Sequence, residues 1–349
     1  MDTPTVVVTQ HEATDVEALL TEAQRELEAG HYETAAQKFE FVVDEAQHPA
    51  ERARAMLGLG TALDAAGRPE QALVIYERYV TEAPEGSQRD EVRVRLVRLL
   101  TYLEKYADAA AIAAQVRTAQ AALGDVALLA SLALDALAQD RQKDAELAIA
   151  RGRSVIEAEM FDRLDPIPLD VAALYFALGE LRRKRAEEIS FDPLPPDFSA
   201  ALEMRCQWML DAQSAYSQAM RGRDAHWSAM AGVSVGRLYH ELHQELMAME
   251  RPSAADTTQR RELFDGALRL RYSILLTKAA SMLRATLALQ DKDRAPGVWA
   301  ARAKQTLADI EAAEREEQRA LSLLPYSKAQ LQQVLDDLAA RGNSSVPKK

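Results

Sequence analysis

The feature of this sequence that most constrains its fold is an alanine that recurs at a nearly constant interval. Ala35, Ala72, Ala109 and Ala145 are separated by 37, 37 and 36 residues. Each follows a short polar segment and precedes larger apolar side chains at helical spacing. A unit of this length cannot bury its apolar face alone, so we expect successive units to stack on one another.

The second of these units carries the most detailed pattern. Gly60 and Ala72 are small residues at which two helices of a pair can approach closely, and Tyr76 and Tyr79 are large enough to fill the space between pairs. Pro84 ends the second helix of the pair. This arrangement resembles the tetratricopeptide repeat, which is a helix–turn–helix unit. The resemblance covers about four repeats over residues 15–158, of which the other three are degenerate.

The whole chain is predicted to be all-α. Alanine, leucine, glutamate, glutamine and arginine dominate, and patterns typical of strands are nearly absent. We expect a flexible arm over residues 1–14, a right-handed helical solenoid over 15–158, a region of long helices over 170–341 and a disordered tail over 342–349. The long helices are expected at about 198–221, 224–250, 257–290 and 297–324, with a short capped helix at 328–340. They could continue the repeats with atypical length or form a bundle.

A second resemblance concerns this C-terminal region. Trp227, the segment 236–239 and Trp299 are similar to the end modules of repeat-rich envelope and motility proteins of myxobacteria-type bacteria. The resemblance implies a scaffold associated with the cell envelope. Residues 1–4 lack the basic start of a signal peptide, so the chain as written is expected in the cytoplasm. A mature form trimmed at a cleavage site would instead be periplasmic or envelope-associated.

Composition narrows the range of partners. The net charge is −12 and is concentrated in the first half of the chain, so nucleic acid and anionic membrane surfaces are poor partners. No apolar run approaches the roughly 20 residues that a transmembrane helix needs. The single cysteine, Cys206, has no second cysteine with which to form an intramolecular disulfide.

Motifs of catalysis are scarce. His240 and His243 are three residues apart, whereas the zinc-protease pattern needs a spacing of four, and no third ligand is evident. We expect no catalytic residue, no cofactor and no metal site, and we expect Cys206 to be a small buried side chain. The basic run 182–185 precedes Glu187 and Glu188, which favours salt bridges within one helix over contact with an acidic ligand.

The resemblance to tetratricopeptide repeats predicts a binding groove lined by the first helix of each pair. The lining positions are Glu17, Leu20, Gln24 and Leu27 in the first repeat, Arg54, Leu57, Thr61 and Asp64 in the second, Glu91, Val94, Arg98, Thr101 and Tyr102 in the third, and Ala127, Ala130, Leu134 and Leu137 in the fourth. This mixture of apolar and charged residues suits an amphipathic helix or an extended peptide. The last four residues could instead pack against the second half and close the groove.

Three functions follow as hypotheses. The first is a non-catalytic scaffold or assembly factor that binds a helix or peptide of another protein in this groove. The alternative is an architectural subunit that associates with itself or with the cell envelope. The third, an enzyme, would need a polar pocket between the two halves, near His240, Glu241 and Cys206. Family members that grip chaperone carboxyl-termini use lysine and asparagine in the groove, and this chain has none at the matching positions, which are Leu20, Gln24, Leu57 and Thr61.

Overall fold

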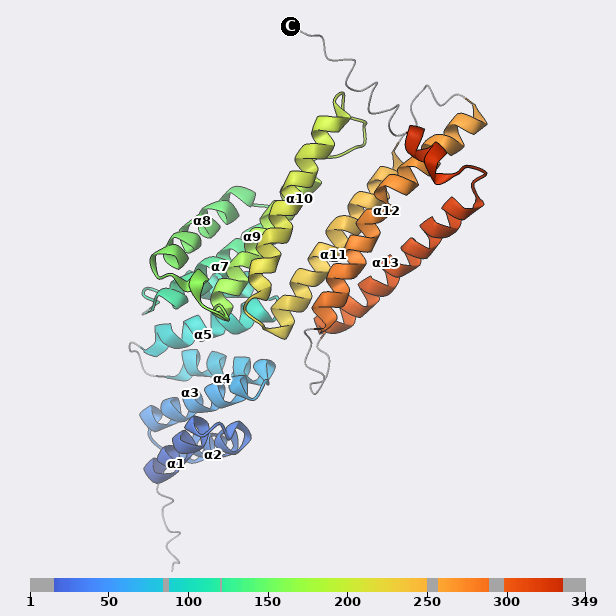
Figure 1. Cartoon of the computed structure of the whole chain (residues 1–349). Helices are drawn as coiled ribbons and strands as arrows, with labels where there is room; N and C mark the ends of the chain where they lie inside the picture. The colour runs from blue at the N-terminus through green and yellow to red at the C-terminus, as the bar shows by residue number, and fades with distance from the viewer. Residues whose placement is uncertain (1–15, 84–87, 120, 250–256, 289–297, 335–349) are drawn as a thin grey trace, which may run out of the picture. The chain divides into compact units, whose positions relative to one another are not determined.

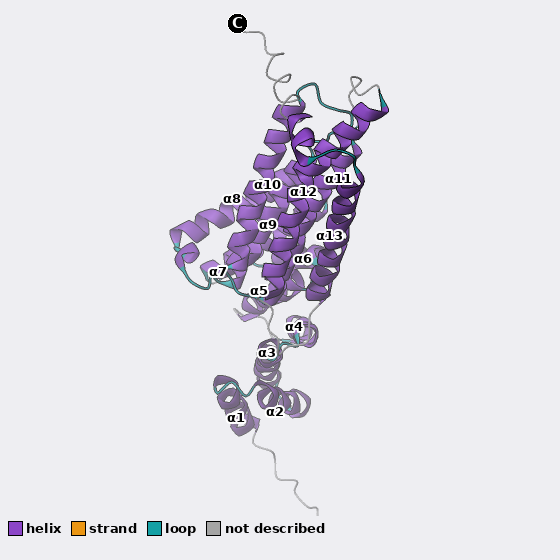
Figure 2. Cartoon of the chain, turned by 45° about the vertical axis from the view of Figure 1, so that its right-hand side comes forward, coloured by secondary structure: helices purple, strands orange, loops and turns teal. Residues whose placement is uncertain are grey.

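A computed structural model describes residues 16–83, 88–119, 121–249, 257–288 and 298–334. Helices and their connecting loops account for all of these residues, with no strand among them (Figure 2). The prediction of an all-α fold is therefore confirmed. The predicted arm over 1–14 and tail over 342–349 lie outside the described residues.

The chain divides into two compact units, residues 1–135 and 136–349, and each is considered by itself. The predicted domain boundary near residue 158 remains a prediction. The first unit is built from α1 (Val16–Glu28), α2 (Tyr32–Glu45), α3 (Pro49–Ala65), α4 (Pro69–Glu82), α5 (Gln88–Tyr102), α6 (Tyr106–Ala113) and most of α7 (Ala122–Ala138), which spans the division (Figure 1).

The turn inside each helix pair repeats with the period of the sequence. Gly30, Gly67, Glu104 and Asp140 all have positive φ, between 58° and 81°. In each turn the next residue's N–H donates to a carbonyl five residues back, as from Arg68 to Leu63 at 2.9 Å. This bond and the left-handed residue define a Schellman motif, which satisfies carbonyls left free at the end of the first helix. The period therefore originates in a local backbone structure.

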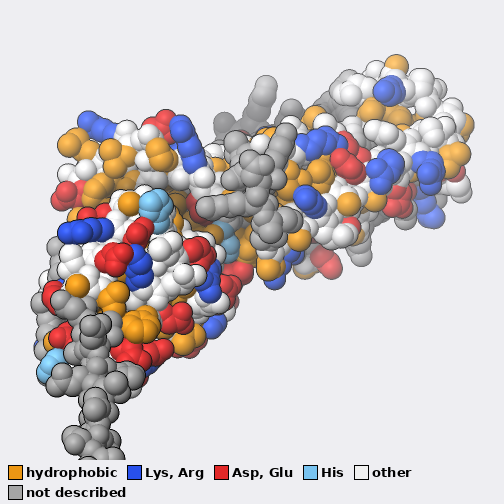
Figure 3. Space-filling view, turned by 90° about the horizontal axis from the view of Figure 1, so that it is seen from below, with side chains coloured by type: hydrophobic (Ala, Val, Ile, Leu, Met, Phe, Trp, Pro, Cys, Tyr) orange, Lys and Arg blue, Asp and Glu red, His pale blue; other side chains and the backbone are white. Residues whose placement is uncertain are grey.

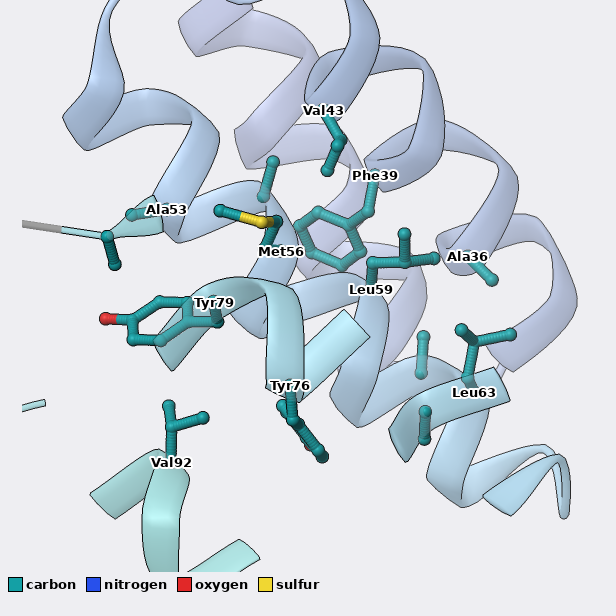
Figure 4. Close-up of a cluster of buried hydrophobic side chains, with 14 of the residues drawn as sticks. Ala36, Phe39, Val43, Ala53, Met56, Leu59, Leu63, Tyr76, Tyr79 and Val92 are labelled. Carbon is teal, nitrogen blue, oxygen red and sulfur yellow. The ribbon is translucent and has the colours of Figure 1, made fainter. Parts of the chain in front are cut away.

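Close helix approach forms the core of the first unit. A Cβ atom added at Gly60 would lie 2.4 Å from the ring of Tyr76, so the ring occupies the space that glycine leaves on α3. Tyr76 is fully buried and Phe39 is 2% exposed. Figure 4 shows both rings among buried aliphatic side chains, with Met56 and Leu59 of α3 beside Phe39. Gly60 is thus a point of close approach within its helix pair, as predicted, but the ring of Tyr76 fills the space inside this pair, whereas the sequence pattern predicted it between pairs.

The second unit contains much longer helices. They are α8 (Gln142–Ala158), the 3-10 turn η1 (Phe161–Arg163), α9 (Leu169–Glu187), α10 (Phe198–Met220), α11 (Ala225–Ala248), α12 (Thr258–Ala288) and α13 (Val298–Leu323). The last four match the predicted long helices to within a few residues. Residues 328–334 are also helical. Ser327 and Gln330 form the predicted capping box, with Ser327 N–H donating to Gln330 Oε1 at 2.8 Å.

Helix pairing in the second unit reproduces the small-to-large contact of the repeats at greater length. A Cβ at Gly179 of α9 would lie 2.5 Å from the ring of Tyr216 on α10, and one at Gly236 of α11 would lie 2.6 Å from Leu283 on α12. The helix α13 packs against both α11 and α12. Within the second unit, α9 pairs with α10 and α11 with α12 through these contacts, and α13 completes a three-helix bundle with α11 and α12. Continuation of the repeats into this region stays a prediction.

Candidate protein-binding surface

The structure separates the predicted groove residues of the first unit by their exposure. Leu20, Val94 and Thr101 are 3 to 4% exposed and belong to the core, so their side chains are not at the surface. The half-buried residues are Leu27, Leu57, Thr61, Glu91 and Tyr102, and the exposed residues are Glu17, Gln24, Arg54, Asp64 and Arg98. A partner could reach only these two groups.

Glu17 of α1 and Arg54 of α3 pair across two successive first helices. The Arg54 guanidinium donates to both carboxylate oxygens, at 2.8 and 3.0 Å. Both side chains remain more than half exposed, so the pair adds little to stability. Its two parallel bonds nevertheless hold the two side chains in one orientation at the surface.

A second link joins α3 to α5. Arg95 donates to Thr61 Oγ1 at 3.1 Å and to Glu91 Oε1 at 3.0 Å. Thr61 Oγ1 also lies 3.3 Å from the hydroxyl of the buried Tyr76. A core aromatic therefore helps to position a polar pair at the surface. Arg95 is absent from the sequence-based lining, although it lies four residues after Glu91 and three before Arg98, on the same helix face as both.

Charges of both signs lie next to this link. Loss of hydration raises the pKa of Asp64, while the positive charges of Arg95 and Arg98 act against the rise. We name the set Arg54, Leu57, Thr61, Asp64, Arg95 and Arg98 the first-helix surface. Its apolar member, Leu57, is half-buried and packs against the core. Acidic, basic and apolar side chains also intermingle in the space-filling view rather than forming patches of one kind (Figure 3).

The residues considered for chemistry are part of the helix packing. His243 is 4% exposed, with Nε2 3.8 Å from Glu317, and burial lowers its pKa. Cys206 is half-buried rather than buried, and loss of hydration raises the pKa of its thiol. In the part of the chain that the structure describes, no three histidine, cysteine or acidic side chains gather closely enough to hold a metal ion.

The basic run 182–185 uses partners that its sequence does not indicate. Arg183 bonds Glu180 and Glu187 within α9, as predicted, but Lys184 and Arg185 reach Asp140 and Glu146 in other parts of the second unit. Contacts between helices thus supplement the predicted salt bridges within α9.

Helix pairs with a recurring left-handed turn and small-to-aromatic contacts define the fold class of the first unit. Residues 26–89 match the family model of the tetratricopeptide repeat, so the chain contains tetratricopeptide repeats. The match spans α2, α3 and α4, which carry the close contacts at Gly60 and Tyr76. A search of the curated proteins found no match to the chain. None of the described helices is long and apolar enough to cross a membrane.

Proposed function

We propose that this protein is a non-catalytic interaction scaffold whose first-helix surface binds a helical or extended segment of another protein. Tetratricopeptide repeats are in general protein–protein interaction modules. The observation that carries the proposal is the pair of links between successive first helices, Glu17 to Arg54 and Arg95 to Thr61. They fix polar side chains across neighbouring repeats, where an extended partner would run.

The links reduce the cost of binding. Side chains already held in one conformation lose less entropy when a partner binds. Leu57 would supply an apolar contact, while Asp64 and Arg98 would favour a partner with complementary charges and set its direction. A partner segment disordered on its own would lose its own entropy on binding, which limits the affinity.

The test compares two substitutions of an exposed or half-buried apolar residue by aspartate. Leu57→Asp changes the first-helix surface, and the control Val74→Asp changes a residue on α4 that is 59% exposed. Full-length protein of each kind would be cross-linked in host extract, and the captured proteins identified by mass spectrometry. We expect a partner that is recovered with wild type and Val74→Asp and is at least tenfold depleted with Leu57→Asp.

Equal recovery with both variants would contradict the proposal, provided that circular dichroism shows Leu57→Asp to be folded. Recovery of the protein itself as the sole partner would favour the alternative, an architectural subunit that self-associates. In that case the mass measured by analytical ultracentrifugation would rise with concentration.

A further inference from the structure

A polar pocket lies within the second unit, away from the residues used above. Its volume is about 340 Å³. It is lined by Arg153 of α8, Asp162 of η1, Tyr175, Leu178 and Arg182 of α9, and Ser214, Ala215, Gln218 and Arg221 of α10. The lining thus carries three guanidinium groups and one carboxylate. The pocket is at the small end of the range for ligand sites, with room for one or two acidic side chains.

The arginines are held in place largely by uncharged groups. Arg182 donates to the carbonyl of Asp211 at 2.8 Å, and Arg221 donates to the Gln218 side chain at 2.8 Å and to the carbonyl of Asp162 at 2.9 Å. Over the described residues, neither guanidinium lies within 4 Å of a carboxylate. Their orientation is therefore fixed by uncharged acceptors, while Asp211 acts on the charge of Arg182 only from a longer distance.

The third arginine, Arg153, is paired with a carboxylate but still acts on Arg182. Arg153 lies 3.6 Å from Glu157 on its own helix. Burial lowers the pKa of Arg182, Asp211 acts against this, and repulsion by Arg153 and Arg185 lowers it further. Two like charges in a partly desolvated pocket repel each other. A bound anion would be attracted to both and would offset this repulsion.

We propose that this pocket is a binding site for carboxylates, and that its ligand is an acidic segment of a protein partner. Guanidinium groups bind carboxylates through two parallel hydrogen bonds, and Arg182, whose Nη1 donates to the Asp211 carbonyl, retains further N–H groups for such bonds. Arg221 already donates from Nη1 to Gln218 and from Nη2 to the carbonyls of Asp162 and Leu164, so it contributes charge rather than a second pair of bonds. The Tyr175 hydroxyl can donate a third. Leu178, which is 9% exposed, offers apolar contact to the methylene groups of glutamate. The chain's net charge of −12 makes this basic pocket a local exception that would orient an acidic segment.

The test uses a fluorescein-labelled nonapeptide with three consecutive glutamates between glycine and serine residues. Its control has glutamine in place of each glutamate. Fluorescence anisotropy with the full-length protein at low salt would give the dissociation constant. We expect the glutamate peptide to bind wild type and the glutamine peptide to bind at least tenfold more weakly. Inorganic phosphate, titrated alone, tests whether a free anion is the ligand instead.

Matched variants test whether the glutamate peptide binds in this pocket. Arg153→Gln and Arg151→Gln each remove one positive charge from an exposed position on α8, but only Arg153 belongs to the pocket lining. We expect Arg153→Gln and Arg182→Gln to weaken binding about tenfold and Arg151→Gln less than twofold. Arg182→Lys keeps the charge but loses the paired bonds, so we expect about a threefold loss.

Three outcomes would overturn the inference. Equal losses in Arg151→Gln and Arg153→Gln would show general charge attraction. The second is failure of the glutamate peptide to bind folded wild type, and the third is binding of phosphate without binding of the peptide. Because the pocket belongs to the second unit, Leu57→Asp is expected to bind the peptide like wild type. Failure here and failure of the first-helix surface are thus distinguishable.

Discussion

At the scale of single residues, the four repeat turns differ in how well their sequence suits a left-handed backbone. Gly30 and Gly67 adopt positive φ with no steric cost, whereas Glu104 and Asp140 adopt it with a side chain. The third and fourth turns keep the period of the sequence, although Glu104 and Asp140 stand where the first two turns have glycine. The surrounding hydrogen bonds are therefore sufficient to impose the conformation at a non-glycine residue.

We expect Gly67→Ala to lower the free energy of unfolding by about 1 kcal/mol. A Cβ added at Gly67 would meet no atom within 4 Å, so the cost is conformational rather than steric. Glu104→Gly should have the opposite effect and stabilise by about 0.5–1 kcal/mol. Urea denaturation followed by circular dichroism measures both.

The control for this prediction is Glu104→Ala, which keeps the steric cost of positive φ and removes only the carboxylate. A gain in stability equal to that of Glu104→Gly would show that the charge of Glu104, rather than its backbone, is the source of the effect.

At the scale of helices, a buried arginine and its carboxylate partner restrict how α10 docks on α11. Arg205 of α10, 2% exposed, donates to both carboxylate oxygens of Glu245 on α11, at 2.6 and 2.7 Å, and to the carbonyl of Ile189 at 2.8 Å. The Glu245 side chain is 40% exposed, so it is the arginine that loses its hydration, and the pair penalises any docking of α10 on α11 that leaves Arg205 alone.

Removal of one partner should therefore be costly. We expect Glu245→Gln to destabilise the protein by about 2–4 kcal/mol, because the buried Arg205 guanidinium would lose its counter-charge. The double variant Arg205→Met with Glu245→Gln should recover most of that loss. A thermal or urea melt of the two variants makes the comparison. An equal loss in both would show that packing of the Arg205 side chain, and not its charge, is what matters.

A buried histidine makes the three-helix bundle sensitive to acid. His243 of α11 faces Glu317 of α13, which accepts a bond of 2.7 Å from Arg269 of α12. Burial lowers the pKa of His243 below its ordinary value of 6.5, Glu317 raises it, and His240 and Arg269 lower it further. The unfolded chain therefore binds the proton more readily than the folded one.

Protonation of His243 therefore leaves the free energy of unfolding unchanged above pH 6.5. The free energy falls as the pH drops from 6.5 toward the lower pKa that His243 has in the folded protein. The slope is at most about 1.4 kcal/mol per pH unit. We expect His243→Gln to flatten the dependence of unfolding free energy on pH between 7.5 and 5.5. Parallel curves for wild type and variant would contradict the assignment to His243.

At the scale of the whole molecule, charge bears on association. The net charge of −12 at pH 7 opposes contact between copies, and the sequence isoelectric point is about 5.1. We expect association measured by light scattering to be greatest near pH 5.1 and to fall at pH 7.5. Association that is stronger at pH 7.5 than at 5.1 would contradict this and would support an architectural role through a specific interface.

Much of the fold was determined by local sequence. Several features depend on residues within about one repeat of each other and therefore not on how the helices pack. These features are the alanine interval, the turns, the capping box at Ser327 and the long helices. The close approach at Gly60 follows from local sequence as well, but the position of the Tyr76 ring against Gly60, inside one pair rather than between pairs, does not.

The sites were decided by tertiary structure. Arg95 and Thr61 are 34 residues apart and Arg182 and Asp211 are 29 apart, so each contact depends on how two separate helices are rotated against each other. A rotation by one residue, about 100°, changes which side chain faces its neighbour. Sequence pattern determined which faces are apolar, but only the packed helices decided that Leu20, Val94 and Thr101 are buried and that three arginines share one pocket.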